Sequence, residues 1–150
     1  MNDSFILRDR KWRETNERVT LSSYAMLSEE SIGRFEKEDQ DPFRTVFERD
    51  RDRIIHSKTF RRLKHKTQVF INPDGDHFIT RMTHTLNVTQ IGRSIAKTLG
   101  LNPDLTEAIC LGHDVGHSPF GHTGEEVLND MLDGGWSHSE NSVRMLSIIE

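Results

Sequence analysis

The hydrophobic pattern becomes regular from Phe43 onward, where apolar residues recur at intervals of three, four and seven positions. These residues are Phe43, Val46, Phe47, Ile54, Ile55, Phe60 and Leu63. Such spacing places the apolar side chains on one face of an amphipathic helix. We expect this helix to begin with Asp41 as its N-cap and Pro42 at its first position, and to break near His56 and Ser57.

Two further helices are predicted between residues 81 and 111. In the first, apolar residues keep roughly helical spacing, and Gly100 follows as a typical C-terminal residue. These apolar residues are Met82, Leu86, Val88, Ile91, Ile95 and Leu99. The second helix begins at Asn102-Pro103-Asp104, which supplies an N-cap, a proline at the first position and an acid in the first turn. Its surface is mostly apolar, so we expect it to be the central helix of the fold.

The C-terminal third contains a loop, HSPFG, followed by two more predicted helices. One resumes near Thr123 and ends before Gly134-Gly135. The other begins at Ser137, which forms a candidate capping box with Glu140.

The other segments show weaker patterns. Residues 66–71 (KTQVFI) and 77–80 (HFIT) are rich in β-forming residues and flank the turn sequence NPDGD, which predicts a small β-hairpin. Residues 1–42 are polar, show no sustained period and are interpreted as an irregular arm, packed on the body or on a neighbouring subunit. The prediction is therefore an all-α fold with one small β-hairpin near residues 66–80, an N-terminal arm at 1–42 and a helical domain at 43–150.

The composition narrows the class of protein. The 150 residues suit one domain, but 29% are charged and only 33% hydrophobic, which suggests that a partner or further chain covers part of the surface. The last helix reaches Glu150 without a stop signal, so we expect a fragment. The single cysteine excludes a disulfide framework, and no apolar run approaches the roughly 20 residues of a membrane span. We expect a soluble, cytoplasmic protein without membrane contact.

Residues 44–66 are strongly basic on the polar side of the first predicted helix, although the net charge of the chain is −4. Two interpretations stay open: a solvated helix face, or a surface for polyphosphate, whose oxygens match the fork of an arginine guanidinium. In the second interpretation, Arg53 and Arg62 are candidate substrate-binding residues.

The densest chemistry lies between residues 81 and 125. His84 lies on one predicted helix and His113-Asp114 ends the next, and the short link at 99–102 favours antiparallel packing, which can bring them together. Imidazole and carboxylate are common ligands of Mg, Mn, Fe, Co and Ni, and three protein ligands leave positions for water and a phosphate oxygen. We predict a divalent metal centre at these three residues.

His122 and Glu125 are three positions apart and therefore share one helix face. A carboxylate beside an imidazole raises its basicity and fixes its tautomer. We interpret them as a proton-transfer pair.

The order of these motifs is similar to that of a known group of enzymes. His84 followed by His113-Asp114 resembles the HD superfamily of metal-dependent phosphohydrolases. The blocks RDRIIHSKTFRRLKHKTQVF (51–70), RMTHTLNVTQIGRSIA (81–96) and LGHDVGHSPFGHTGE (111–125) resemble the deoxyguanosinetriphosphate triphosphohydrolase (dGTPase) family. The resemblance covers residues 24–150 and implies the N-terminal part of an HD-domain helical bundle.

The resemblance also implies roles for individual residues. His84, His113 and Asp114 match metal ligands, and His122 and Glu125 match a catalytic pair that acts on the bond between the α-phosphorus and the 5′ oxygen. The residues that match substrate-binding positions or that we group with them are Gln68, Arg81, His117, His138, Arg53 and Arg62. The family's fourth metal ligand, an aspartate on a later helix, has no counterpart in this chain.

The implied reaction is hydrolysis of a deoxynucleoside triphosphate, dGTP above all, to deoxynucleoside and inorganic triphosphate. The resemblance also implies a homo-oligomer. Two alternatives stay open. One is an HD phosphohydrolase that acts on a nucleoside monophosphate or a signalling nucleotide. The other is a non-catalytic module that binds nucleotide or single-stranded nucleic acid through the basic face of residues 44–66.

Overall fold

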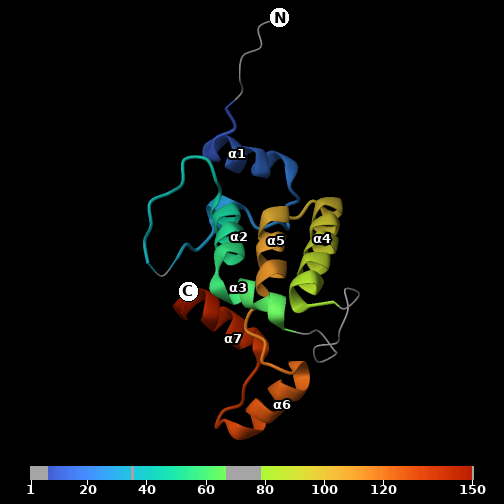
Figure 1. The fold of residues 1–150 in the computed structure, drawn as a ribbon. Coiled ribbons are helices and arrows are strands. Elements are labelled where there is room, and N and C mark those ends of the chain that lie inside the picture. Colours follow the sequence, from blue (N-terminus) through green and yellow to red (C-terminus); the bar gives the residue numbers. More distant parts are fainter. Residues whose placement is uncertain (1–6, 35, 67–78, 150) are drawn as a thin grey trace, which may run out of the picture.

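The computed structural model describes residues 7–34, 36–66 and 79–149, and these ranges are mainly helical (Figure 1). The α-helices are α1 (Arg10–Thr20), α2 (Val46–His56), α3 (Lys58–Arg62), α4 (Arg81–Leu99), α5 (Pro103–Gly112), α6 (Gly121–Met131) and α7 (His138–Arg144). Short 3-10 turns occur at η1 (Ser28–Glu30) and η2 (Leu63–His65), and η3 (Met145–Ile149) extends α7 with π-helical geometry. The all-α prediction is confirmed for this part of the chain.

Helix α5 lies between α2 and α4 and packs against both (Figure 1). The buried core combines side chains of α3, η2, α5 and the loop after α5: Phe60, Leu63, Leu111 and Val115. Partly buried side chains from α2, α4 and η3 pack against it: Ile54, Met82 and Leu146. The central position predicted for α5 is confirmed, and the turn at His113 and Asp114, directly after α5, lies between Leu111 and Val115 of this core.

The break predicted after His56 is confirmed, since Ser57 is extended (φ −66°, ψ 153°) between α2 and α3. The predicted start of α2 was wrong. Thr45, not Asp41, is the N-cap, and Thr45 and Glu48 satisfy each other's backbone N–H groups in a capping box. Asp41 instead accepts hydrogen bonds from two backbone N–H groups in the turn before α2. The reciprocal box satisfies two donors of the helix itself, which explains why α2 begins later.

The N-terminal region is not wholly irregular, because Arg10–Thr20 forms helix α1. Asp9 caps α1 by accepting a hydrogen bond from Trp12 N at 2.8 Å, and Arg10 pairs with Glu14 one turn later. Helix α1 has no buried residue. Its stability therefore comes from polar contacts, which a search for hydrophobic periodicity does not detect.

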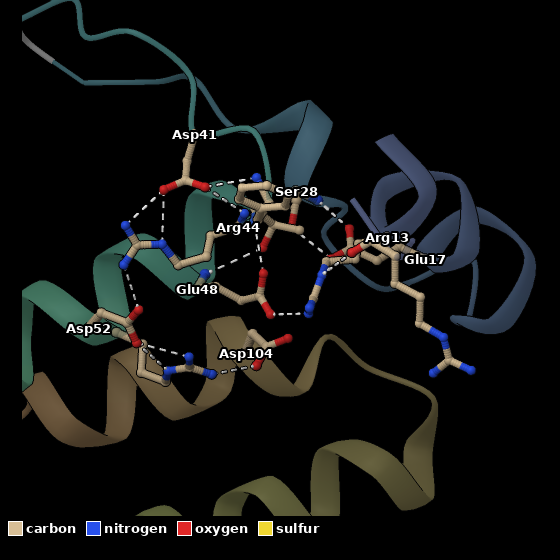
Figure 2. A network of polar contacts seen from close by, with 12 residues as sticks. Arg13, Glu17, Ser28, Asp41, Arg44, Glu48, Asp52 and Asp104 are labelled. Atoms are coloured by element: carbon tan, nitrogen blue, oxygen red, sulfur yellow. Dashed lines mark hydrogen bonds and ion pairs between the residues drawn. The ribbon is translucent and has the colours of Figure 1, made fainter. Parts of the chain in front are cut away.

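A network of polar contacts joins α1, η1, α2 and α5 (Figure 2). Arg13 of α1 pairs with Glu48 of α2 at 2.6 Å. The carboxylate of Glu17 accepts hydrogen bonds from the backbone and hydroxyl of Ser28, both at 2.7 Å, and one from Asn102 Nδ2 at 3.2 Å. The N-terminal arm is thus packed on the body of the same chain, which is one of the two arrangements expected for it.

Helices α4 and α5 are joined by a tight link. Gly100 adopts the left-handed conformation (φ 68°) and ends α4, as predicted, and Asn102 caps α5 by accepting hydrogen bonds from the backbone N–H groups of Asp104 and Leu105. This link turns the chain back on itself, so the two helices pack along their length and the start of α4 lies beside the end of α5.

The predicted β-hairpin falls largely on residues 67–78, which lie outside the described residues, so it stays a prediction. On either side of that segment, Arg81 N donates a hydrogen bond to Lys66 O at 2.9 Å. Within residues 7–34, 36–66 and 79–149, no strand is present, only an isolated bridge position at Thr80. In the same ranges, no helix is both long enough and apolar enough to cross a membrane.

Candidate metal centre and acid–base cluster

The antiparallel packing of α4 and α5 brings His84, in the first turns of α4, beside His113 at the end of α5. Their ring centroids are 5.7 Å apart, and the potential ligand atoms of His84, His113 and Asp114 lie within 4.8 Å of one another. The structure therefore places the three predicted ligands in one cluster, hereafter the metal centre. Because protein ligands bind such ions at about 2.0–2.2 Å, donor atoms this close together can share one ion.

The donor atoms are oriented by neighbouring groups. His113 Nδ1 lies 2.7 Å from Cys110 O, so it carries the proton and leaves Nε2 as the lone-pair nitrogen. Nε2 lies 3.7 Å from Asp114 Oδ1. The other carboxylate oxygen of Asp114 accepts a hydrogen bond from Arg81 Nη1 at 2.8 Å, and both residues are buried. These contacts direct one histidine nitrogen and one carboxylate oxygen to the same point, which fits a cation site.

The Asp114 carboxyl is held in its charged form. Burial on its own raises its pKa, but the hydrogen bond and the charge of Arg81 outweigh burial, and the net effect lowers the pKa. An ionised carboxylate is the form that binds a metal ion.

A second cluster follows within a few residues, and it comprises His117, His122, Glu125 and His138 (hereafter the acid–base cluster). Glu125 Oε2 lies 3.0 Å from His122 Nδ1, so the predicted pair is in hydrogen-bonding contact. Glu125 also accepts hydrogen bonds from the backbone N and the ring Nδ1 of His138, both at 2.9 Å. The ring of His117 stacks on that of His138 with 4.5 Å between centroids.

Two members of the acid–base cluster have strongly shifted pKa values. For Glu125, burial on its own raises the pKa. Hydrogen bonds from the backbone and side chain of His138 and from His122 have a larger effect in the opposite direction, and the net result is a pKa of about 2. Burial, and then the positive charge of Arg81, lowers the pKa of His117 to about 4. At neutral pH the cluster thus contains a carboxylate and a neutral, buried imidazole.

Three buried nitrogen atoms near these clusters have no hydrogen-bond partner among the described residues: His117 Nδ1, His117 Nε2 and Arg81 Nε. Buried polar groups usually have a partner, and an exception calls for an explanation. His117 and Arg81 are two of the predicted substrate-binding residues, which makes a bound ligand a natural partner.

The remaining predicted substrate-binding residues are more dispersed. Gln68 lies outside the described residues. Arg53 pairs with Glu38 at 2.8 Å and lines a cavity of about 1140 Å³ that also reaches His113 and His138, whereas Arg62 is exposed on α3 and is not among the residues that line it. Neither arginine is brought into the two clusters.

The basic face of residues 44–66 is neutralised within the chain over its first part, residues 44–53. Four of its arginines form ion pairs with carboxylates: Arg44, Arg49, Arg51 and Arg53. For these four arginines, the pairing favours the interpretation of a solvated, structural face over that of a free polyphosphate surface.

The sequence did not single out two residues that support the site. Lys66 Nζ donates a hydrogen bond to His117 O at 2.7 Å, and burial followed by the charge of Arg81 lowers the pKa of Lys66. Ser142, buried on α7, bonds to the loop that follows the metal centre. Lys66 was hidden in a run of basic residues, while the i, i+4 spacing of His138 and Ser142 was a signal that both face the same side of a helix.

The low pKa of Glu125 predicts a pH-dependent stability. A carboxyl with a lower pKa in the folded state binds fewer protons there, so its stabilising effect is complete above about pH 4.5 and is lost as the pH falls toward about 2. We expect urea titrations to show a shallower decline over this range for Glu125→Gln than for the unmodified chain. Glu126→Gln, which removes the neighbouring charge of α6, is the control and should decline as the unmodified chain does. Equal slopes for all three would contradict the assigned contacts of Glu125.

Comparisons with known proteins show which proteins this chain is similar to. Residues 81–150, which carry both clusters, match the HD domain family. The chain is 60% identical over 144 residues to a "Deoxyguanosinetriphosphate triphosphohydrolase-like protein" of Caldanaerobacter subterraneus subsp. tengcongensis, which covers 96% of this chain and 42% of that protein. It is 59% identical over 141 residues to a protein of the same description from Clostridium tetani, which covers 94% of this chain and 40% of the relative.

These matches confirm the resemblance to the dGTPase family over nearly the whole chain. The chain spans about two fifths of the length of these relatives.

Proposed function

We propose that this chain carries the metal-binding and acid–base part of a deoxynucleoside triphosphate triphosphohydrolase. The substrate would be dGTP or another deoxynucleoside triphosphate, and the products the deoxynucleoside and inorganic triphosphate. The observation that carries the proposal is the presence of the two clusters at the two ends of one short loop, from His113 to His122. The names of the similar proteins support the choice of substrate.

The donor set at the metal centre fits a divalent cation, because it combines two imidazoles with an ionised, oriented carboxylate. His84, His113 and Asp114 would hold the ion, whose identity among Mg, Mn, Fe, Co and Ni is open. When bound, such an ion polarises the α-phosphate and withdraws charge from its oxygens.

His122 is placed to move the proton that the reaction requires. Glu125 is a carboxylate at neutral pH and can only accept hydrogen bonds, so His122 Nδ1 donates to it and Nε2 is the ring nitrogen left to exchange a proton with substrate. The His122 side chain is 76% exposed and can therefore reach a bound substrate. In the net reaction, water adds to the α-phosphorus and the 5′ oxygen leaves as a hydroxyl, so one proton must pass from water to that oxygen.

His117 and Arg81 would bind the phosphates. Arg81 Nε and the single N–H of the neutral His117 imidazole have no partner among the described residues and can donate to phosphate oxygens, and the positive charge of Arg81 suits an anionic ligand. His138 would lie beside the same phosphates, because its ring stacks on that of His117.

The test is the identity of the products. Each deoxynucleoside triphosphate is incubated with metal-loaded protein and the products are separated by ion-exchange chromatography. We expect deoxynucleoside and triphosphate, at any measurable rate. Release of pyrophosphate would contradict the proposal. Hydrolysis of a deoxynucleoside monophosphate supplied in parallel, without turnover of any triphosphate, would instead support the alternative phosphohydrolase, and binding without turnover would support a non-catalytic module.

We also propose that the protein acts as a homo-oligomer and that the isolated chain turns over weakly. On one side of α4, Ile91, Ile95 and Leu99 are 59%, 53% and 60% exposed, and on α6 Met131 is 74% exposed. Apolar surface of this kind typically binds another protein surface. We place the protein in the cytoplasm, where its proposed substrates occur.

Light scattering after size-exclusion chromatography tests the association. We expect a mass that is a multiple of 17.4 kDa. Ile91→Lys/Ile95→Lys should shift it toward the monomer, whereas Lys97→Glu on the same helix should shift it less. A monomer for the unmodified chain, with rapid dGTP hydrolysis, would contradict both parts of the proposal.

A further inference from the structure

The position of Glu125 depends on α7 more than on its own helix. Helix α6 has no buried residue, and its N-cap position, Phe120, makes no side-chain capping hydrogen bond. Glu125 is instead held by His138, the first residue of α7, through both a backbone N–H and a ring nitrogen. Whatever fixes α7 therefore also fixes the carboxylate that orients His122.

Helix α7 is fixed to the loop after the metal centre by two side chains. The hydroxyl of Ser142 accepts a hydrogen bond from Gly116 N at 2.9 Å and lies 3.0 Å from His113 O and 2.8 Å from His138 O, between which it shares its proton. Asn141 Nδ2 donates a hydrogen bond to Gly116 O at 2.8 Å.

The approach of α7 to this loop is very close. A Cβ atom at Gly116 would lie only 2.2 Å from Ser142 N, so only glycine allows the two backbones to meet here. A serine that merely fits a helix would bond a carbonyl of its own helix alone. The bonds of Ser142 to Gly116 and His113 are additional and cross between two elements.

We propose that Ser142, assisted by Asn141, is a positioning residue that couples the metal centre to the acid–base cluster. Its hydroxyl joins the carbonyl oxygens of two residues. One is His113, a candidate cation ligand, and the other is His138, whose backbone N–H and ring Nδ1 hold Glu125. Ordering of His113 by a cation would then be passed through Ser142 to α7 and on to Glu125. The catalytic meaning of this coupling rests on the proposed function, but the coupling itself does not.

The test measures Glu125 directly and needs no turnover. The pKa of Glu125 is read from its carboxyl ¹³C resonance in the metal-free chain, where the titratable groups that face it are His122 and His138, with His117 stacked behind. Ser142→Ala releases α7 and should raise the pKa of Glu125 from about 2 toward 4.5, by at least about one pH unit. Ser147→Ala is the matched control, because that exposed hydroxyl bonds Val143 O in the same helical segment and makes no other hydrogen bond among residues 7–34, 36–66 and 79–149, and it should leave the value unchanged.

Circular dichroism checks that each variant is folded. If Ser142→Ala does not fold, Asn141→Ala weakens the same junction from a less buried position and should shift the pKa in the same direction. A folded Ser142→Ala or Asn141→Ala chain with the Glu125 value of the unmodified chain would overturn the proposal. A shifted Glu125 in a protein that hydrolyses no deoxynucleoside triphosphate would preserve the coupling and refute the proposed function.

A kinetic measurement gives the second readout in protein that turns over substrate. Ser142→Ala should lower kcat and leave the cation content unchanged, because the ligands themselves stay in place. Loss of the cation together with kcat, while the Glu125 pKa stays that of the unmodified chain, would show that Ser142 supports only the metal centre, which would contradict a role in positioning Glu125.

Discussion

Replacing Asp114 is expected to abolish cation binding at the metal centre. Asp114 is the anionic member of the His84–His113–Asp114 set, and without it only the two imidazoles remain to hold a divalent ion. Changes to groups that only orient metal ligands typically cost about 10- to 100-fold in affinity, so the loss of a ligand should cost at least that much. Titration with Co²⁺, followed by its visible absorption and by elemental analysis of the purified protein, measures the effect.

The choice of substitution matters because Arg81 is buried against Asp114. Asp114→Ala leaves that guanidinium unpaired, which commonly costs about 3–5 kcal/mol of stability. Asp114→Asn preserves the shape of the side chain, and His84→Ala removes a ligand that makes no ion pair with Arg81. Asp130→Ala, on the exposed side of α6, is the control for a lost carboxylate. If Asp114→Asn and His84→Ala bind as much cation as the unmodified chain and Asp130→Ala, the proposed metal centre is excluded.

The parts of the fold that were predicted correctly are those specified by local signals. The end of α4 at Gly100 and the start of α5 at Asn102 follow from backbone conformations and caps that a few residues determine. The antiparallel arrangement of these helices then follows from the length of the link. This is why sequence reasoning could also bring His84 toward His113.

Helix α1 was missed because its contacts are distant in sequence. Helix α1 buries no residue and is held by pairs such as Arg13 with Glu48, which no periodicity reveals. The start of α2 was misplaced because Asp41 and Thr45 are both good caps, and only the capping box with Glu48 decides between them.

In the candidate site, too, contacts between residues close in sequence were predictable and contacts between distant residues were not. The spacing of His122 and Glu125 on one helix face was enough to predict their contact. The bond from His138 to Glu125 was not predictable in the same way, because it spans 13 positions and depends on where α7 is fixed. Likewise, the pairing of Arg81 with Asp114 connects α4 to the turn after α5 and makes one predicted substrate residue a neighbour of the metal centre.

Loss of the His122 imidazole is expected to reduce turnover strongly and to leave the cation in place. General acid–base groups typically contribute about 10²–10⁴-fold in rate, and we expect His122→Ala to lower kcat by an amount in that range. Since the side chain is 76% exposed, the substitution should change stability little. Triphosphate release measures kcat, and elemental analysis measures the cation. His65→Ala, at an exposed histidine of η2, is the control.

A double substitution separates the roles of His122 and Glu125. If Glu125 acts only by orienting His122 and keeping its Nδ1 proton in place, Glu125→Gln should slow the unmodified protein but have no further effect in His122→Ala. Residues that act as a unit give such non-additive losses. A further fall in the double variant would mean that Glu125 contacts substrate or water on its own, and loss of the cation in His122→Ala would make His122 a metal ligand rather than a proton-transfer group.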